Sequence, residues 1–140
     1  YTAIKLLTSI KGYDSPETIA QKLNIPLKHV NKALEFLVSV GLCVEVNGKL
    51  NPGPANTHLG SDSPLVTRHH QNWRVKGFER MGDLRPNEIF FTMPATLTEK
   101  DSLLLRRKIV DFIDDFVKVI DSSKGEVLHC LNVDWFDVTP

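Results

Sequence analysis

The chain has 140 residues, of which 41% are hydrophobic and 24% charged, and its 17 basic residues balance its 17 acidic residues. This composition is typical of a soluble globular protein and excludes a disordered or fibrous chain. No apolar run approaches the ~20 residues of a membrane-spanning helix and no signal peptide is present, so we expect a cytoplasmic protein with no membrane partner. Cys43 and Cys130 suit a reducing compartment and offer neither a disulfide framework nor a CxxC ligand pair.

The first residues predict two short helices. Apolar side chains recur at helical spacing from residue 2 to residue 10, and the chain begins at Tyr1 without a capping residue, which favours a longer protein in which something precedes it. Ser15 and Pro16 start a second helix, because serine can accept a hydrogen bond from a free N–H group and proline at the first helical position has no N–H group to lose. Pro26 ends that helix, since the residue before a proline is biased away from helical backbone angles.

A third helix and a hairpin follow. The helix is predicted from about residue 26 or 27 to Val40, with Gly41 just beyond its end. Asn47 and Gly48 lie between two short extended runs and predict a type I′ hairpin, whose two central residues need positive φ angles. Helix, helix, helix and hairpin within residues 1–52 is the order of a winged helix-turn-helix, a DNA-binding fold. The core stripe of the third helix consists of Leu27, Val30, Ala33, Leu34 and Leu37.

The remaining residues predict a linker and a second sub-domain. Residues 51–64 hold three prolines and two glycines without a hydrophobic period, so residues 53–64 are predicted to be the linker. A helix over 65–81, a strand over 88–93, a long helix to about residue 120 and a strand over 127–136 follow. Thr98 is expected to cap the long helix, with Asp101 in the third position of a capping-box variant.

The predicted fold class is therefore α+β. A winged helix-turn-helix at 1–52 is joined by the linker to an α-β-α-β dimerisation or sensory sub-domain, with a small sheet, at 65–140. A sheet of two strands leaves open edges, which favours a homodimer through this sub-domain, although a helix covering the edge would serve equally.

The exposed face of the third helix carries the candidate DNA-binding residues. Lys28 and Lys32 can reach guanine O6 and N7 or a phosphate, Asn31 can pair with adenine, and Lys49 in the hairpin can meet a backbone phosphate. Residues 1–60 hold six lysines against four acidic residues, whereas residues 98–140 carry a net charge of −3. This polarity permits weak DNA binding by one copy. The same residues could instead be the solvated face of a surface helix.

A protein-interaction module whose winged helix no longer binds DNA is the alternative. It is favoured by the zero net charge and by Phe36, a large apolar residue that points away from the core stripe and could bind a protein partner. On the long helix, the basic run 106–108 and the acidic residues 111, 114 and 115 are interpreted as solvated faces.

No chemistry is predicted. The GxSxG, P-loop and GxGxxG motifs and the HxH, HxxxH and HExxH spacings are absent, so we expect no enzyme, no catalytic residue, no cofactor and no metal site.

Three segments carry a family resemblance: Arg68 to Trp73, Ile89 to Met93 ahead of the capped long helix, and Leu131 to Phe136. They resemble a bacterial family of conserved hypothetical proteins related to transcriptional regulators, and the resemblance covers essentially the whole chain through diffuse structural motifs. It implies an N-terminal helix-turn-helix, then a winged-helix segment and an uncharacterised C-terminal α-β-α-β domain, with no catalytic or ligand residues. This chain would be the C-terminal part of a transcription regulator, with a second DNA-binding domain before Tyr1, and could be its dimerising or sensing part.

Overall fold

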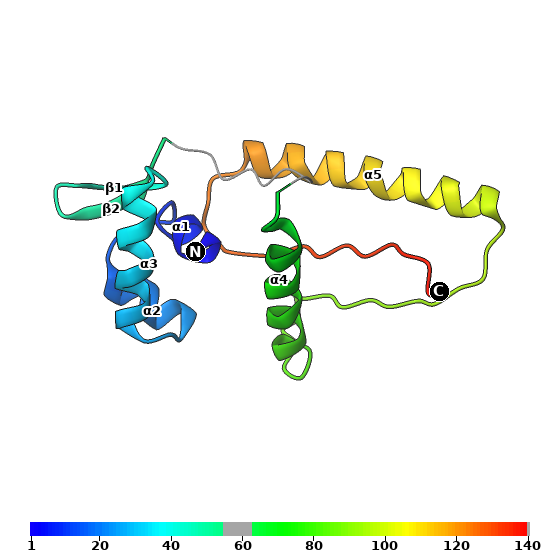
Figure 1. The fold of residues 1–140 in the computed structure, drawn as a ribbon, viewed down its shortest axis with the longest axis horizontal. Coiled ribbons are helices and arrows are strands. Elements are labelled where there is room, and N and C mark those ends of the chain that lie inside the picture. The colour runs from blue at the N-terminus through cyan, green and yellow to red at the C-terminus, as the bar shows by residue number, and fades with distance from the viewer. Residues whose placement is uncertain (55–62, 140) are drawn as a thin grey trace. The chain divides into compact units, whose positions relative to one another are not determined.

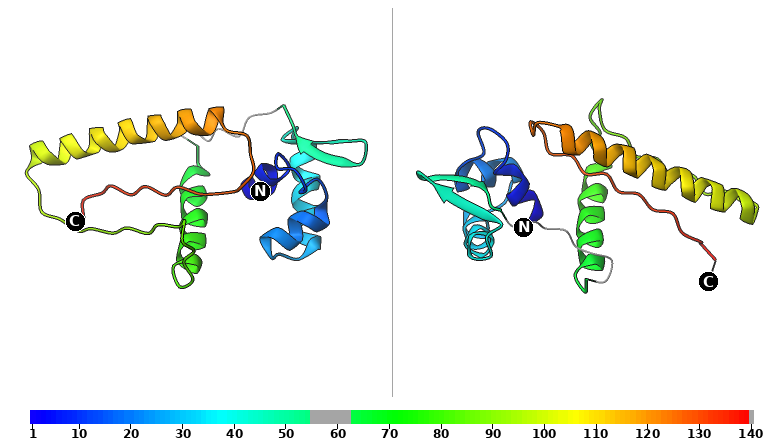
Figure 2. Two further views of the ribbon diagram at one scale, coloured as in Figure 1. Left: turned by 180° about the vertical axis from the view of Figure 1, so that it is seen from behind. Right: turned by 90° about the horizontal axis from the view of Figure 1, so that it is seen from above.

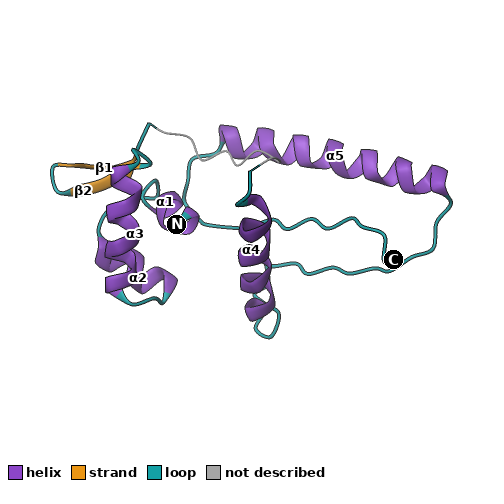
Figure 3. Cartoon of the chain, in the orientation of Figure 1, coloured by secondary structure: helices purple, strands orange, loops and turns teal. Residues whose placement is uncertain are grey.

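The computed structural model describes residues 1–54 and 63–139, and Figure 1 shows their elements in chain order. The fold is α+β, as predicted: about five helices and one two-stranded antiparallel sheet lie in the described residues (Figure 3). The chain forms two compact units, Tyr1–Ser63 with Gly125–His129, and Pro64–Lys124 with Cys130–Pro140. The predicted linker falls largely on residues 55–62, outside the described residues.

The first unit begins with three helices, α1 (Thr2–Leu7), α2 (Pro16–Leu23) and α3 (Leu27–Ser39). The predicted start of α2 is confirmed: the Ser15 hydroxyl accepts a hydrogen bond from the backbone N–H of Thr18, and Pro16 occupies the first turn. Asn24 ends α2 in the left-handed conformation, with φ of 51°. A short turn then leads into α3, which packs against both preceding helices.

A hairpin of β1 (Cys43–Val46) and β2 (Lys49–Pro52) completes this unit and packs through β1 against α3 (Figure 2). Val46 pairs with Lys49 across the turn, and Asn47 and Gly48 have φ angles of 53° and 74°, as the type I′ turn requires. Gly53 follows β2 so closely against the backbone of Gly41 that a Cβ atom there would overlap the Gly41 carbonyl oxygen.

The core of the first unit is formed by side chains from every one of its elements. Its largest fully buried side chains are Leu7, Ile19, Val30, Leu37 and Cys43. Leu128, from the distant segment Gly125–His129, packs against the same core. The predicted second sub-domain at 65–140 is therefore interrupted, because five of its residues belong to the first unit.

The second unit contains α4 (Val66–Arg80) and α5 (Glu99–Ser122). The predicted cap of α5 is confirmed: the Thr98 hydroxyl accepts from the Asp101 N–H at 3.1 Å and donates to the Asp101 carboxylate at 2.8 Å. No residue of either helix is buried. Within the described part of the chain, no helix is long and apolar enough to cross a membrane.

The two strands predicted at 88–93 and 127–136 are corrected by the structure. Both segments form no strand in the described residues, and Figure 3 draws them as loops. Their β-branched and aromatic side chains fit a pleated surface, but a strand also needs a neighbour with which to pair. The sheet of the described residues is β1-β2 alone, so the predicted α-β-α-β sheet is wrong for the single chain.

Candidate functional site

The side of α3 that faces away from the core carries a continuous polar strip, which we call the α3 strip: Lys28, Asn31, Lys32 and Glu35. All four side chains are exposed. They lie together because residues three and four apart share one face of a helix. The opposite face is buried through Val30, Ala33, Leu34 and Leu37. Three of the four predicted DNA-binding residues are thus brought onto one surface.

The N-terminal end of α3 adds hydrogen-bond donors beside this strip. The residue before the helix is Pro26, and no side chain caps the first turn. Free N–H groups at a helix start attract anions, because the helix dipole is positive there. Lys28 lies in this first turn, so a charged donor and backbone donors occur together.

Lys49, the fourth predicted residue, lies on β2 and is already engaged. Its ammonium group is 2.8 Å from the Asp14 carboxylate, and the backbone N–H of Leu50 donates to the Asp14 carbonyl. The hydrogen bond from Lys49, and then its charge, lower the pKa of Asp14, while Asp14 raises the pKa of Lys49. Sequence reasoning missed Asp14, because no local spacing relates a loop residue to a strand so far along the chain.

Phe36 lies on the flank of α3 between the polar strip and the core. Its side chain is 48% exposed, which agrees with its predicted outward direction. The ring of Tyr1 lies edge-on to it, with centroids 5.1 Å apart. Tyr1 is also exposed, so the two rings form a small aromatic patch that the sequence pattern alone had not joined.

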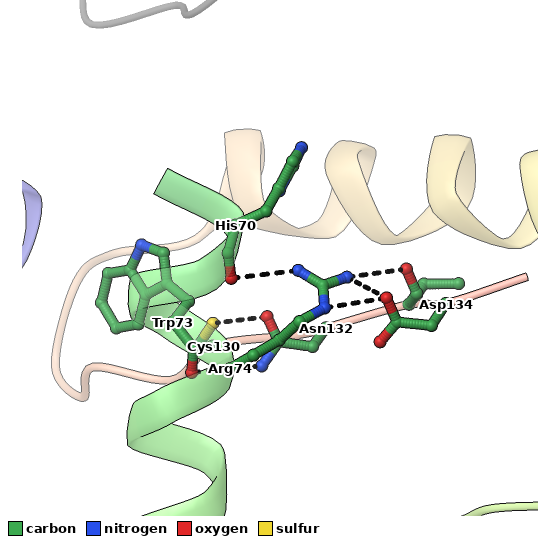
Figure 4. A network of polar contacts seen from close by, with 7 residues as sticks. His70, Trp73, Arg74, Cys130, Asn132 and Asp134 are labelled. Atoms are coloured by element: carbon green, nitrogen blue, oxygen red, sulfur yellow. Dashed lines mark hydrogen bonds and ion pairs between the residues drawn. The ribbon is translucent and has the colours of Figure 1, made fainter. Parts of the chain in front are cut away.

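In the second unit, Arg74 on α4 holds the extended chain near residue 134 (Figure 4). Its Nε donates to the Asp134 carboxylate at 2.8 Å, its Nη2 contacts the same oxygen, and its Nη1 donates to the carbonyl of His70. Asn132 adds a side-chain hydrogen bond to the Trp73 carbonyl. Arg74 therefore ties α4 to the segment that contains Asn132 and Asp134.

Arg80, the last residue of α4, makes a similar clamp. Its Nε donates to both oxygens of Glu88, and its Nη1 donates to Asp83. The backbone N–H of Arg85 is the main cause of the lowered pKa of Glu88, with Arg80 adding to it. Arg74 and Arg80 of α4 are thus each paired with carboxylates of their own unit.

The described residues gather no group of three His, Cys, Asp or Glu side chains that could hold a metal ion. His69 contacts the Trp73 ring, with centroids 6.3 Å apart, and His70 contacts His69. Cys43 is buried beside the Thr8 hydroxyl, and burial raises the pKa of its thiol. A protonated, inaccessible thiol is a poor nucleophile.

Comparison with known proteins finds one family. The model of a family described as "Domain of unknown function (DUF4423)" matches residues 1–138. No curated protein and no solved structure matches the chain.

Proposed function

The chain belongs to the DUF4423 family over nearly its whole length, and we propose that it is part of a bacterial transcription regulator whose first unit is a winged helix that binds duplex DNA. The α3 strip supports this proposal most strongly, because it puts Lys28, Asn31 and Lys32 on the exposed face of a helix whose other face is anchored in the core. A rigidly held helix with donors on its outer face suits the major groove.

The turn between α2 and α3 supports the same proposal. In a helix-turn-helix, the second helix enters the groove with its first residues while the preceding helix braces it. Here α2 packs against α3, and the start of α3 combines uncapped N–H groups with Lys28. The hairpin β1-β2 beside α3 takes the place of the wing, where Lys49 can exchange Asp14 for a backbone phosphate.

The modest charge of this unit limits the expected affinity. Residues 1–60 carry a net charge of +2, and the phosphate contacts of lysine and arginine supply most non-specific DNA affinity. We therefore propose weak binding by one copy and stronger binding by a pair of copies or by a longer protein. The proposed role is non-catalytic and cytoplasmic, and needs no cofactor.

The direct test is fluorescence anisotropy of the full chain with a labelled duplex from the region upstream of its own gene, at several salt concentrations. Lys28→Ala combined with Lys32→Ala should weaken binding and reduce the slope of log K against log salt by about 1.8, since each lost phosphate contact removes ~0.9. Asn31→Ala should weaken binding to that duplex and leave the salt slope unchanged, because an amide reads base edges without releasing counterions.

The matched control is Lys100→Ala combined with Lys124→Ala, which removes the same charge from exposed positions of the second unit. This control should keep the slope of the unaltered chain. If both double variants lower the slope equally, or neither does, the α3 strip is not the DNA-binding surface.

A protein partner at the aromatic patch is the second candidate, supported by the exposure of Phe36 and Tyr1. Exposed aromatic pairs are typical of protein-binding surfaces. Phe36→Ala should then abolish capture of a partner that both the unaltered chain and the Lys28→Ala, Lys32→Ala variant retain. The DNA proposal predicts instead that Phe36→Ala leaves duplex binding unchanged.

A further inference from the structure

The helix α5 has an apolar stripe that its own chain leaves largely open. Leu105, Ile109, Phe112, Phe116 and Val119 recur at alternating spacings of four and three residues, the pattern of a helix that packs along another helix. Phe112, Phe116 and Val119 are 53%, 36% and 67% exposed, and the first two rings lie 6.1 Å apart on the same face. Exposed apolar stripes of this length mark contact surfaces.

The charges along α5 are divided between its two halves. The half from Glu99 to Val110 carries a net charge of +2, and the half from Asp111 to Ser122 carries −3. In the described part of the chain, the basic segment 106–108 forms no ion pair, and its three side chains are exposed. Asp114 is likewise exposed, while Asp115 reaches only Lys118 on the same helix, at 2.7 Å.

This division is self-complementary in one orientation only. When two copies of α5 lie antiparallel with their centres together, residue 107 of one copy lies level with residue 114 of the other, so the basic half of each copy runs beside the acidic half of its partner. At about 100° per residue, Lys108 and Asp115 lie on the same flank of the apolar stripe and can meet across the pair, whereas Arg107 and Asp114 lie on the opposite side of the helix. A parallel pair would place like charges together, and like charges repel at close range. The antiparallel arrangement also opposes the two helix dipoles.

The same register brings the apolar stripes into contact. Ile109 of one copy faces Phe112 of the other, and Leu105 faces Phe116, so these two aliphatic side chains each meet an aromatic ring. This alternation of small and large side chains is the condition for close packing between helices. Charge and packing thus select one alignment, about the midpoint of the helix.

The exposed large apolar side chains are concentrated in the second unit. Its two helices bury no residue.

We propose that α5 is the dimerisation surface of this protein and that its occupant is the α5 helix of a second copy, in antiparallel orientation. The inference does not depend on DNA binding by the first unit. In this proposal, the charges on α5 do more than face solvent: they favour pairing with a second α5 helix and set its antiparallel orientation.

Charge exchange tests the proposal. In sedimentation velocity over a range of concentrations, the unaltered chain should dimerise. Arg106→Glu, Arg107→Glu, Lys108→Glu together, or Asp114→Lys, Asp115→Lys together, should each weaken the dimer at least tenfold, because like charges then meet across the pair. An equimolar mixture of the two variants should dimerise again, since each reversed segment finds its complement in the other chain.

The control reverses Lys28 and Lys32 to glutamate on the first unit, which should leave the dimer unchanged while abolishing DNA binding. Failure of the two proposals is therefore distinguishable. A chain that stays monomeric at all concentrations overturns the α5 inference, as does a dimer indifferent to both charge reversals or a mixture that does not associate.

The orientation has its own measurement. A spin label at Lys100→Cys, with Cys130→Ser and with Cys43 protected by burial, reports the distance between the two copies of residue 100. The antiparallel register places the labelled backbone sites about 32 Å apart at 1.5 Å per residue. A separation near 10 Å would mean a parallel pair and would overturn the proposed arrangement.

Discussion

The two units of this chain use apolar residues in opposite ways. The first unit buries its apolar side chains, with Leu7, Ile19, Val30 and Leu37 almost wholly withdrawn from solvent. The second unit has two well-formed helices and buries no residue of either. Similar helical patterns therefore have different outcomes: the apolar stripes of the first unit are buried within it, and those of α4 and α5 stay open in the described residues. Changes matched between the two units can test this contrast.

The largest expected effect comes from removing a core side chain. Leu37→Ala empties space beneath α3, where the side chain is 1% exposed, and should lower the free energy of unfolding of the first unit by about 2–5 kcal/mol. Phe78→Ala, on α4 and 72% exposed, removes a larger side chain and should change stability by less than about 0.5 kcal/mol. Urea unfolding followed by circular dichroism measures both. Equal losses would contradict the contrast between the units.

Two glycines give the next comparison. Gly53→Ala forces a Cβ atom against the Gly41 carbonyl and should destabilise the first unit by about 1–3 kcal/mol. Gly82→Ala, after α4, meets no atom within 4 Å and should be neutral or slightly stabilising. Thermal unfolding of both variants provides the measurement, and a tolerated Gly53→Ala would show that the backbone there is less closely packed than described.

Removing a helix cap should have a smaller effect on stability. The loss should extend over the whole first unit but should stay within one helical turn in the second. Ser15→Ala removes the hydrogen bond to the Thr18 N–H and should lower the stability of the first unit by about 1 kcal/mol. Thr98→Ala removes the equivalent bond at the start of α5 and should fray that turn alone. Hydrogen exchange resolved by residue separates a local from a global effect. A global loss on Thr98→Ala would mean that α5 is coupled to the core.

The smallest effect concerns pH and the pair formed by Asp14 and Lys49. The lowered pKa of Asp14 means that its contribution is present above the ordinary pKa of 3.8 and is lost as pH falls through the lower folded value. The raised pKa of Lys49 means that its contribution is lost only as pH rises through a value above 10.5. Asp14→Asn should therefore destabilise the first unit slightly at neutral pH and not below the folded pKa of Asp14. A difference that persists in strong acid would assign the effect to packing.

Much of the first unit follows from local sequence signals. Ser15 with Pro16, Asn47 with Gly48, and the apolar period of α3 each specify a backbone feature within a few residues, and each is found in the structure. The α3 strip is equally local, because helical periodicity alone places its residues on one face.

What the sequence did not reveal depends on contacts between distant segments. Residues 88–93 and 127–136 have strand composition but form no strand, since pairing requires an edge that composition does not describe. Leu128 packs against the core of the first unit, and Asp14 forms an ion pair with Lys49. Both contacts join residues far apart in the sequence, so no local spacing predicts them. The cap at Thr98 was predictable because it is local, whereas the open stripe of α5 was not.

The central claim is that the first unit carries its own core whereas α5 is completed by a second copy. Hydrogen exchange of the full chain at low and at high protein concentration tests it most directly. We expect the amides of α3 to be equally protected at both concentrations, and those of α5 to become protected only when copies associate. Protection of α5 that is strong and independent of concentration would contradict it.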